Sequence, residues 1–232
     1  MARAQNAYTP PFSEMMLYRN PELQQKNATG ANGSKIRTIN SGIAANAAAA
    51  LRSGINAIVP AAASETLQKR FAQALTQWLG TADADKLPAC ENISALTDFQ
   101  ITSGHSFSDR FNVPVTIHQT NDSKLTVGIN AFTPTHDVSA PEGTVLLEVV
   151  FATAGCFLNT GISTGAQVMR IQVPYGDSEI AAQSLHFKVP SDKGVLIVTG
   201  AWLQYYTGKR NGIERVERAE FLPSNVLKAQ YR

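Results

Sequence analysis

The spacing at which apolar residues recur changes near residue 90 of this 232-residue chain. Before that point apolar side chains follow a helical period of roughly 3.6 residues, and after it they alternate in short runs between turn residues. Neither an all-helical nor an all-strand fold accommodates both patterns. The sequence therefore predicts an α+β fold, in which helices precede an antiparallel β-domain.

The helical part is predicted over residues 35–80. A first apolar stripe runs from Ile36 to Ile58, and Pro60 ends it. A second stripe consists of Leu67, Phe71, Leu75 and Trp78. The two stripes predict a helical hairpin. The Ala-rich segment of the first helix gives a smooth surface that another helix can approach closely, so we expect Ala48 and Ala49 to lie in a contact between subunits.

The strand-rich part is predicted over residues 94–232 as an immunoglobulin-like β-sandwich. Val195–Tyr206 is apolar on both faces, which is typical of a central strand, and Asn211-Gly212 is a strong hairpin signal. The expected strands are Leu96–Thr102, Val113–Gln119, Lys124–Phe132, Thr144–Thr153, Gln167–Val173, Ser184–Val189, Val195–Tyr206 and Ile213–Phe221, with Asn225–Ala229 continuing the last.

Part of this region resembles a group of known sequences. The stretch Lys124–Pro134 with Ala140–Thr144, and the hairpin of Leu196–Tyr206 around Asn211-Gly212, are similar to small bacterial β-domain proteins of a Bacteroidetes type, whose function is unknown. The resemblance covers about the C-terminal half of the chain and rests on turns and core alternation. It implies a bacterial origin and carries no activity onto any residue.

Residues 1–34 are predicted to form an extended arm, because Pro10, Pro11 and Pro21 disfavour regular structure. The arm nevertheless contains an apolar cluster, which consists of Phe12, Met15, Met16, Leu17 and Tyr18. Such side chains gain roughly 1.5 to 3 kcal/mol each on burial. We therefore expect the arm to dock, either on its own domain or on a neighbouring subunit.

The charge content narrows the classes of partner. Charged residues make up 16% of the chain, below the roughly 25% usual for soluble domains, which favours a surface partly covered by other subunits. A net charge of +2 without a basic cluster does not suit a nucleic-acid binder. No run of about 18 apolar residues predicts a membrane span, and no secretion signal is recognised. We expect a cytoplasmic protein or one exported by a dedicated non-Sec route.

No combination of residues predicts catalysis, a cofactor or a metal site. The four histidines are His105, His118, His136 and His186, and they are too widely spaced in sequence for a zinc motif. Cys90 and Cys156 belong to no CxxC motif, so we expect buried free thiols rather than a disulfide. Gly161–Gly165 has the spacing of the Gly-x-Ser-x-Gly nucleophile pattern, but it lies between predicted strands and not at the strand-to-helix turn that the nucleophile needs.

The sequence thus favours a non-enzymatic structural protein that self-associates into an oligomer or filament through its arm and Ala-rich helix. The alternative is a β-sandwich module that binds a carbohydrate or another small ligand. That alternative predicts exposed aromatic side chains around the loops Phe107–Phe111, Thr133–Asp137 and Pro174–Asp177. An enzyme is a third hypothesis, for which we find no catalytic combination of residues.

Overall fold

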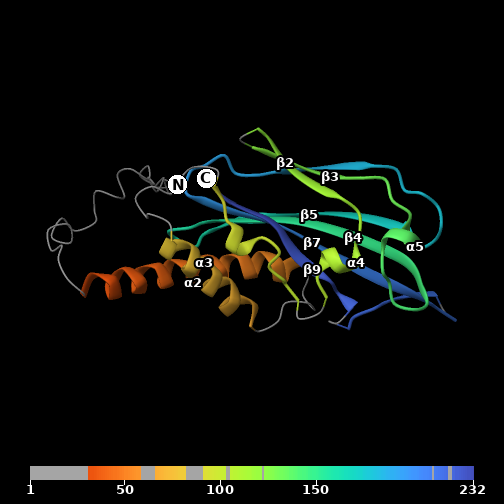
Figure 1. Ribbon diagram of the computed structural model, residues 1–232, viewed down its shortest axis with the longest axis horizontal. Helices are drawn as coiled ribbons and strands as arrows, with labels where there is room; N and C mark the ends of the chain where they lie inside the picture. Colours follow the sequence, from red (N-terminus) through yellow and green to blue (C-terminus); the bar gives the residue numbers. More distant parts are fainter. Residues whose placement is uncertain are drawn as a thin grey trace, which may run out of the picture. The chain divides into compact units, whose positions relative to one another are not determined.

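The computed structural model describes residues 31–58, 66–81, 91–102, 105–121, 123–210, 212–218 and 221–232. These residues form helices and antiparallel sheets (Figure 1), which confirms the prediction of a mixed helix and sheet fold. The chain divides into two units, Met1–Thr38 and Ile39–Arg232. Apart from the first residues of the first helix, the helices and strands belong to the second unit, and most of the predicted arm lies outside the described residues.

Two helices form the predicted hairpin. Helix α2 spans Ala31–Ile58, beginning earlier than expected, and α3 spans Leu67–Thr81. They run antiparallel, because Asn40 Nδ2 donates to the carbonyl of Leu79 at 3.2 Å and Arg52 Nη1 donates to Gln68 Oε1 at 3.3 Å. No helix in the described part of the chain is long and apolar enough to cross a membrane.

The larger of two sheets has the strand order β1-β9-β7-β4-β5, with β8 also paired to β7. Its strands are β1 Glu91–Asn92, β4 Thr144–Phe157, β5 Ser163–Pro174, β7 Val195–Lys209, β8 Gly212–Arg215 and β9 Ser224–Tyr231. Strand β7 is central, with β4 on one side and β8 and β9 on the other. Lys209 pairs with Gly212, which confirms the predicted hairpin.

The smaller sheet has the order β2-β3-β6. Its strands are β2 Val115–Asn121, β3 Lys124–Ile129 and β6 Gln183–Lys188. Leu125, Val127 and Phe187 of this sheet share a buried core with Phe151 and Leu203 of the larger one. The described part of the unit also contains three short helical turns: η2 Ser94–Leu96, α4 Phe107–Arg110 and α5 Pro134–Asp137.

The helical hairpin covers the other face of the larger sheet. Ala47 and Leu51 of α2 form one buried cluster with Cys156 of β4 and Leu196 and Val198 of β7. The unit therefore has three layers, with the large sheet between the helices and the small sheet (Figure 1). The helices and the sheets share one continuous set of packed layers rather than forming separate bodies.

The prediction of a strand over Leu96–Thr102 is wrong. Ser94–Leu96 forms a 3-10 turn, and a single bridge joins Gln100 to Asn225. Asp98 has a φ of 60°, a left-handed conformation that interrupts an extended strand. The apolar alternation of this segment arises because it lies along β9 and buries Ile101. It does so without the continuous backbone pairing of a strand.

Candidate functional site

The two sides of the large sheet differ in whether another strand can pair there. Along β9, the irregular segment of residues 91–102 occupies the outer side. Ile93 N donates to the carbonyl of Ala229, and Asp98 N to that of Val226, both at 2.8 Å. Val226 N in turn donates to the carbonyl of Phe99, also at 2.8 Å. This segment, called here the edge cover, uses hydrogen-bonding groups that an added strand would need.

Helix α3 holds the edge cover in place. The ring of Phe99 stacks on that of Phe71 with centroids 4.4 Å apart and an angle of 16° between the planes. The Arg70 guanidinium carbon lies 4.7 Å from the centre of the Phe99 ring, and Arg70 also donates to the carbonyl of Gln100. These stacking and cation–π contacts each stabilise the arrangement by about 0.5 to 1.5 kcal/mol. The cover is therefore a packed element of the fold.

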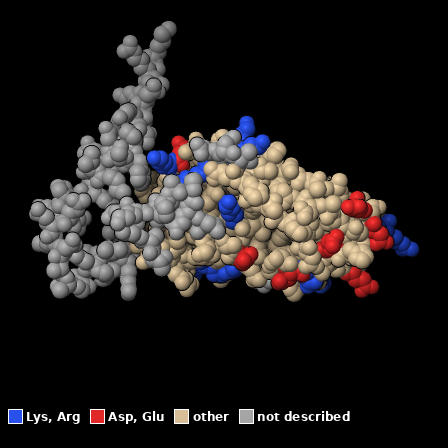
Figure 2. All heavy atoms as spheres, turned by 45° about the horizontal axis from the view of Figure 1, so that its top comes forward, with Lys and Arg blue, Asp and Glu red and all other residues tan. Residues whose placement is uncertain are grey.

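Beyond β9, the same side of the sheet continues as β8, which is only four residues long. It carries Glu214 and Arg215, and Glu214 forms an ion pair with Lys209 of β7. Short length and charged side chains are the devices by which proteins protect a sheet edge. Figure 2 shows a broad uncharged surface, with acidic side chains gathered toward the end of the molecule that holds α5 and the β7–β8 hairpin.

Strand β5, at the opposite side of the large sheet, has neither form of protection. It is 12 residues long and pairs with β4, and no strand in the described part of the chain pairs with its other side. Edge strands of this length are unusual, since most strands have about 3 to 10 residues. Arg170 is the one charged residue in β5. The strand is thus a long and weakly guarded sheet edge.

The direction of the β5 peptide groups follows from its register. Tyr175 N donates to the carbonyl of Val145 at 3.0 Å, and the β4–β5 pairing continues without interruption from there to the bulge near Gly155. In an antiparallel pair, hydrogen-bonded positions alternate along each strand. The odd-numbered residues of β5 therefore bond to β4. The N–H and C=O groups of Val168, Arg170 and Gln172 point to the open side.

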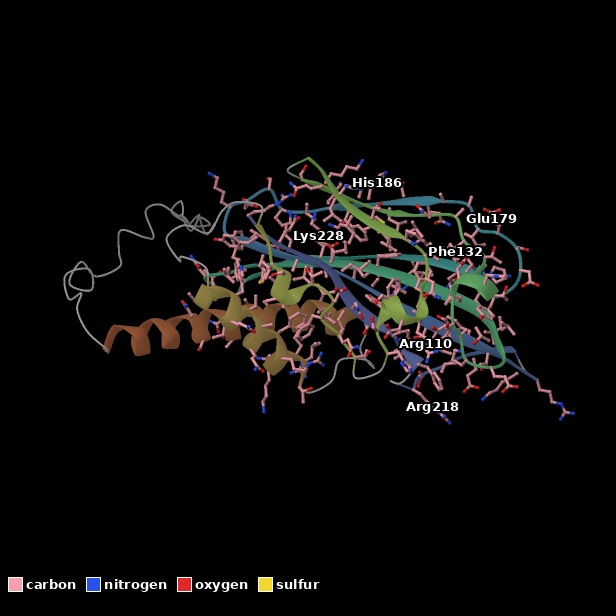
Figure 3. All side chains as sticks on the ribbon, in the orientation of Figure 1. Arg110, Phe132, Glu179, His186, Arg218 and Lys228 are labelled. Atoms are coloured by element: carbon pink, nitrogen blue, oxygen red, sulfur yellow. The ribbon has the colours of Figure 1, made fainter. Side chains whose placement is uncertain are left out.

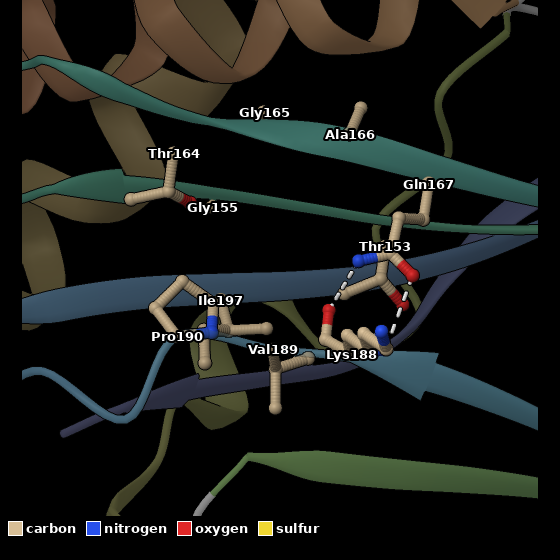
Figure 4. Close-up of a pocket in the computed structure, with 10 residues that line it drawn as sticks. All are labelled: Thr153, Gly155, Thr164, Gly165, Ala166, Gln167, Lys188, Val189, Pro190 and Ile197. Atoms are coloured by element: carbon tan, nitrogen blue, oxygen red, sulfur yellow. Dashed lines mark hydrogen bonds between the residues drawn. The ribbon is translucent and has the colours of Figure 1, made fainter.

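A cavity of about 110 Å³ lies between β5 and the end of β6 (Figure 4). It is lined by Thr153, Gly155, Thr164–Gln167, Lys188–Pro190 and Ile197. A Cβ atom on Gly155 would come within 2.5 Å of Thr164 Oγ1, so the Thr164 side chain would have to move to admit any other residue there. Pockets for drug-sized ligands have about 300 to 1,000 Å³. This cavity is on the scale of one side chain.

Amide side chains join the two sheets on both sides of the unit. Beside the cavity, Lys188 N donates to Gln167 Oε1 at 3.0 Å, and Gln167 Nε2 donates to the Lys188 carbonyl (Figure 4). Across the unit, Gln230 Nε2 of β9 donates to Gln119 Oε1 of β2 at 3.1 Å. Because Gln167 occupies the outward-pointing groups of Lys188, the edge of β6 is blocked at that position while β5 stays open.

A buried polar cluster anchors the middle of β5 to its neighbours. Glu148 of β4 is 7% exposed. Its oxygens accept hydrogen bonds from Gln172 Nε2 at 3.0 Å and from the Tyr206 hydroxyl at 3.2 Å, and Arg170 Nε lies 3.7 Å away. Burial and the nearby Glu148 carboxylate raise the pKa of Tyr206. The signal in the sequence is a single acidic residue in a largely apolar strand, which does not by itself indicate its partners.

The sequence-predicted assembly residues are only partly placed by the structure. Phe12, Met15, Met16, Leu17 and Tyr18 lie outside the described residues. Ala48 is fully buried in the core that its own helix makes with the sheet, whereas Ala49 is exposed. A Cβ on Gly54 would lie 3.3 Å from the Ala154 side chain, so the close helix packing made possible by small residues occurs within the chain. Of the alanine pair, Ala49 alone is available to a partner.

The three loops of the ligand-binding alternative do meet at one end of the unit. Thr135 N donates to the carbonyl of Gly176 at 3.4 Å. Two of their aromatic side chains, however, belong to the core: Phe107 is 2% exposed, and Phe111 packs edge-on against Phe132 with centroids 5.4 Å apart. The third, Tyr175, is partly buried, and its hydroxyl donates to the carbonyl of Val138 at 2.9 Å. Figure 3 shows Phe132 and Arg110 at this end. The exposed aromatic platform that a sugar site needs is not formed by these rings.

The histidines do not converge on a metal site within the described residues, where no group of three ligating side chains is found. Two of them do share a surface, because His118 of β2 and His186 of β6 both pair with Thr126 of the intervening β3. Thr126 Oγ1 lies 3.1 Å from His186 Nδ1, and His186 is labelled in Figure 3. His136 lies in α5, and His105 precedes α4. Two ligands are fewer than a structural zinc site uses.

Cys156 is a buried free thiol, as predicted, and Cys90 lies outside the described residues. The Cys156 Sγ is 3.8 Å from the carbonyl of Ala47. Burial raises the pKa of the Cys156 thiol from 9.0 to about 12. The reactive form of cysteine is the thiolate, so burial in the core disfavours the reactive form of Cys156.

No family model, no curated protein and no solved structure matches this chain. The geometry of the sheet edges and the composition of the surface therefore carry the functional inference.

Proposed function

We propose that this protein is a non-enzymatic structural subunit, and that it self-associates into an oligomer or filament when an extended segment pairs with the open edge of β5. The observation that carries the proposal is the contrast between the two sides of the large sheet. One side has a packed edge cover and a short charged strand. The other presents 12 residues with one charge.

The backbone hydrogen bonds that β5 can offer are comparable in free energy to the cost of association. Each outward-facing residue of β5 except Pro174 offers one donor and one acceptor, and a backbone hydrogen bond contributes about 0.5 to 1.5 kcal/mol net. The loss of translational and rotational freedom on binding is about 4 to 15 kcal/mol. A ladder along β5 therefore offsets much of that loss, and apolar side chains on the added strand must supply the rest. The low charge content of 16% supports a surface that is partly covered.

The assignment of the two facing sheets to the immunoglobulin-like class stays a prediction. It is supported by two antiparallel sheets that share a core. The helical layer on the outer face of the large sheet is an addition that such a sandwich does not require. Self-association at β5 does not depend on this finer classification.

Binding of a carbohydrate remains the alternative hypothesis. It is favoured by the meeting of the three loops near Thr135 and Gly176. The burial of Phe107 and Phe111 and the small volume of the cavity beside β5 weigh against it.

The test of strand addition is the substitution Val168→Pro in the full chain, with Val168→Thr as the matched control. Proline removes an N–H that points away from β4 and is tolerated in edge strands. Threonine keeps the N–H and the branched shape. We expect sedimentation velocity to show weaker association for the proline variant alone, while circular dichroism shows that both variants are folded. Equal association of both variants, or a wild-type protein that stays monomeric at all concentrations, would refute the proposal.

A further inference from the structure

We infer that the strand added to β5 is the segment Phe12–Asn20 of a neighbouring copy, aligned antiparallel so that Glu14 lies opposite Arg170. This inference rests on the proposed function and names its partner. Three properties of the two segments support it: the positions of their prolines, their charges, and the cavity at one end of β5.

The prolines define matching lengths. Phe12–Asn20 is the stretch between Pro11 and Pro21, and every residue in it has an N–H to donate. With Glu14 opposite Arg170, Pro10 falls opposite Pro174, where β5 itself ends. Both strands therefore stop pairing at the same point.

The charges define the register. Arg170 is the one charged residue of β5, and its side chain is 50% exposed. Glu14 is the one acidic residue between Pro11 and Pro21. Directly opposite residues of opposite charge stabilise a strand pair by about 0.2 to 1 kcal/mol, whereas like charges destabilise it.

The cavity and the prolines define the direction. In the antiparallel register Leu17 falls opposite Gln167, beside the cavity, which has room for one apolar side chain. In a parallel arrangement with the same charge pair, Pro11 would fall opposite Gln167, and its backbone would face β5 between Ala166 and Val168. Pro11 has no N–H to donate to the outward-pointing Ala166 carbonyl, so the antiparallel arrangement is the one that completes the ladder.

The experiment is disulfide trapping between two populations of the full chain, both carrying Cys90→Ser. One population carries Met16→Cys and the other Val168→Cys. These positions are opposite in the proposed register as a hydrogen-bonded pair, whose Cα atoms lie about 5.5 Å apart, within the range of roughly 4.4 to 6.8 Å for a disulfide. The control pair is Met15→Cys with Val168→Cys, because side chains of adjacent residues point to opposite faces of a strand.

We expect the mixture of Met16→Cys and Val168→Cys to form a disulfide-linked heterodimer at least about tenfold faster than the control mixture under mild oxidation. Dimers formed by Val168→Cys alone would mean that two β5 edges pair with each other, which overturns this inference and keeps the proposed function. A chain carrying both cysteines that forms an internal disulfide in dilute solution would show that the arm binds its own subunit, which also overturns it. Absence of any cross-link, together with unchanged association of the Val168→Pro variant, would refute both.

Discussion

Two adjacent alanines of α2 provide a sharp test of how this helix is used. Ala48 is fully buried among residues of its own chain, and Ala49 is exposed. An arginine at position 48 would place an unpaired charge in the core, which destabilises by about 3 to 5 kcal/mol. An arginine at position 49 keeps a good helix former on the surface, where substitutions change stability by about 0.5 kcal/mol or less.

For a unit of this size each kcal/mol shifts the midpoint of thermal unfolding by about 2 to 4 °C. Ala48→Arg should therefore lower Tm by roughly 6 to 20 °C, and Ala49→Arg by no more than about 2 °C. Ala48→Leu, which adds volume without charge, should fall between them because overpacking costs about 1 to 3 kcal/mol. Thermal melts followed by circular dichroism measure all three. Similar Tm values for the two arginine variants would show that the Ala48 face is not inside the subunit.

Three further outcomes are expected. Gly161→Ala should lower the free energy of unfolding, measured in urea, by about 1 to 3 kcal/mol, because the φ of Gly161 is 66° and a Cβ would come within 2.8 Å of helix α2. Gly165→Ala should lower it less, because Gly165 has a φ of 94° but no atom within 4 Å of the added Cβ. A larger loss for Gly165→Ala than for Gly161→Ala would contradict the packing of Gly161 against α2. The unfolded state releases the Cys156 proton first, so folding stability should fall as pH rises from about 9 to about 12, by at most about 1.4 kcal/mol per pH unit from this group. Cys156→Ala should flatten that slope, and an unchanged slope would show that the thiol is not the cause. Metal analysis after dialysis should find less than one zinc per chain, and stoichiometric zinc lost on changing His118 or His186 to alanine would establish a site on the small sheet.

Patterns local in sequence were sufficient to predict the two long helices and most of the strands. The apolar faces of Val195–Tyr206 follow from its place as β7 between two paired neighbours. The turn at Gly212 follows from glycine chemistry, since its φ is 133°. Such features depend on a residue and its near neighbours, and these can be read without knowing the rest of the chain.

Features that depend on distant segments were not predictable in the same way. The alternation of Leu96–Thr102 does not reveal that Asp98 takes a left-handed conformation or that the segment covers β9. The small side chain of Ala48 indicates close packing but not which surface provides it. Nothing near Gln167 indicates that its amide meets the backbone of β6. Each depends on a partner at least 20 residues away in the chain.

The edge cover on β9 limits how many partners the large sheet can take. A sheet with one long open edge can pair with only one added strand at that edge. Two copies that met edge to edge would satisfy each other and stop, and the continuous stack of strands found in amyloid would not form by this route. A longer polymer would need each subunit to give a segment as well as receive one. Such a polymer has two chemically different ends, and its ends would grow at different rates.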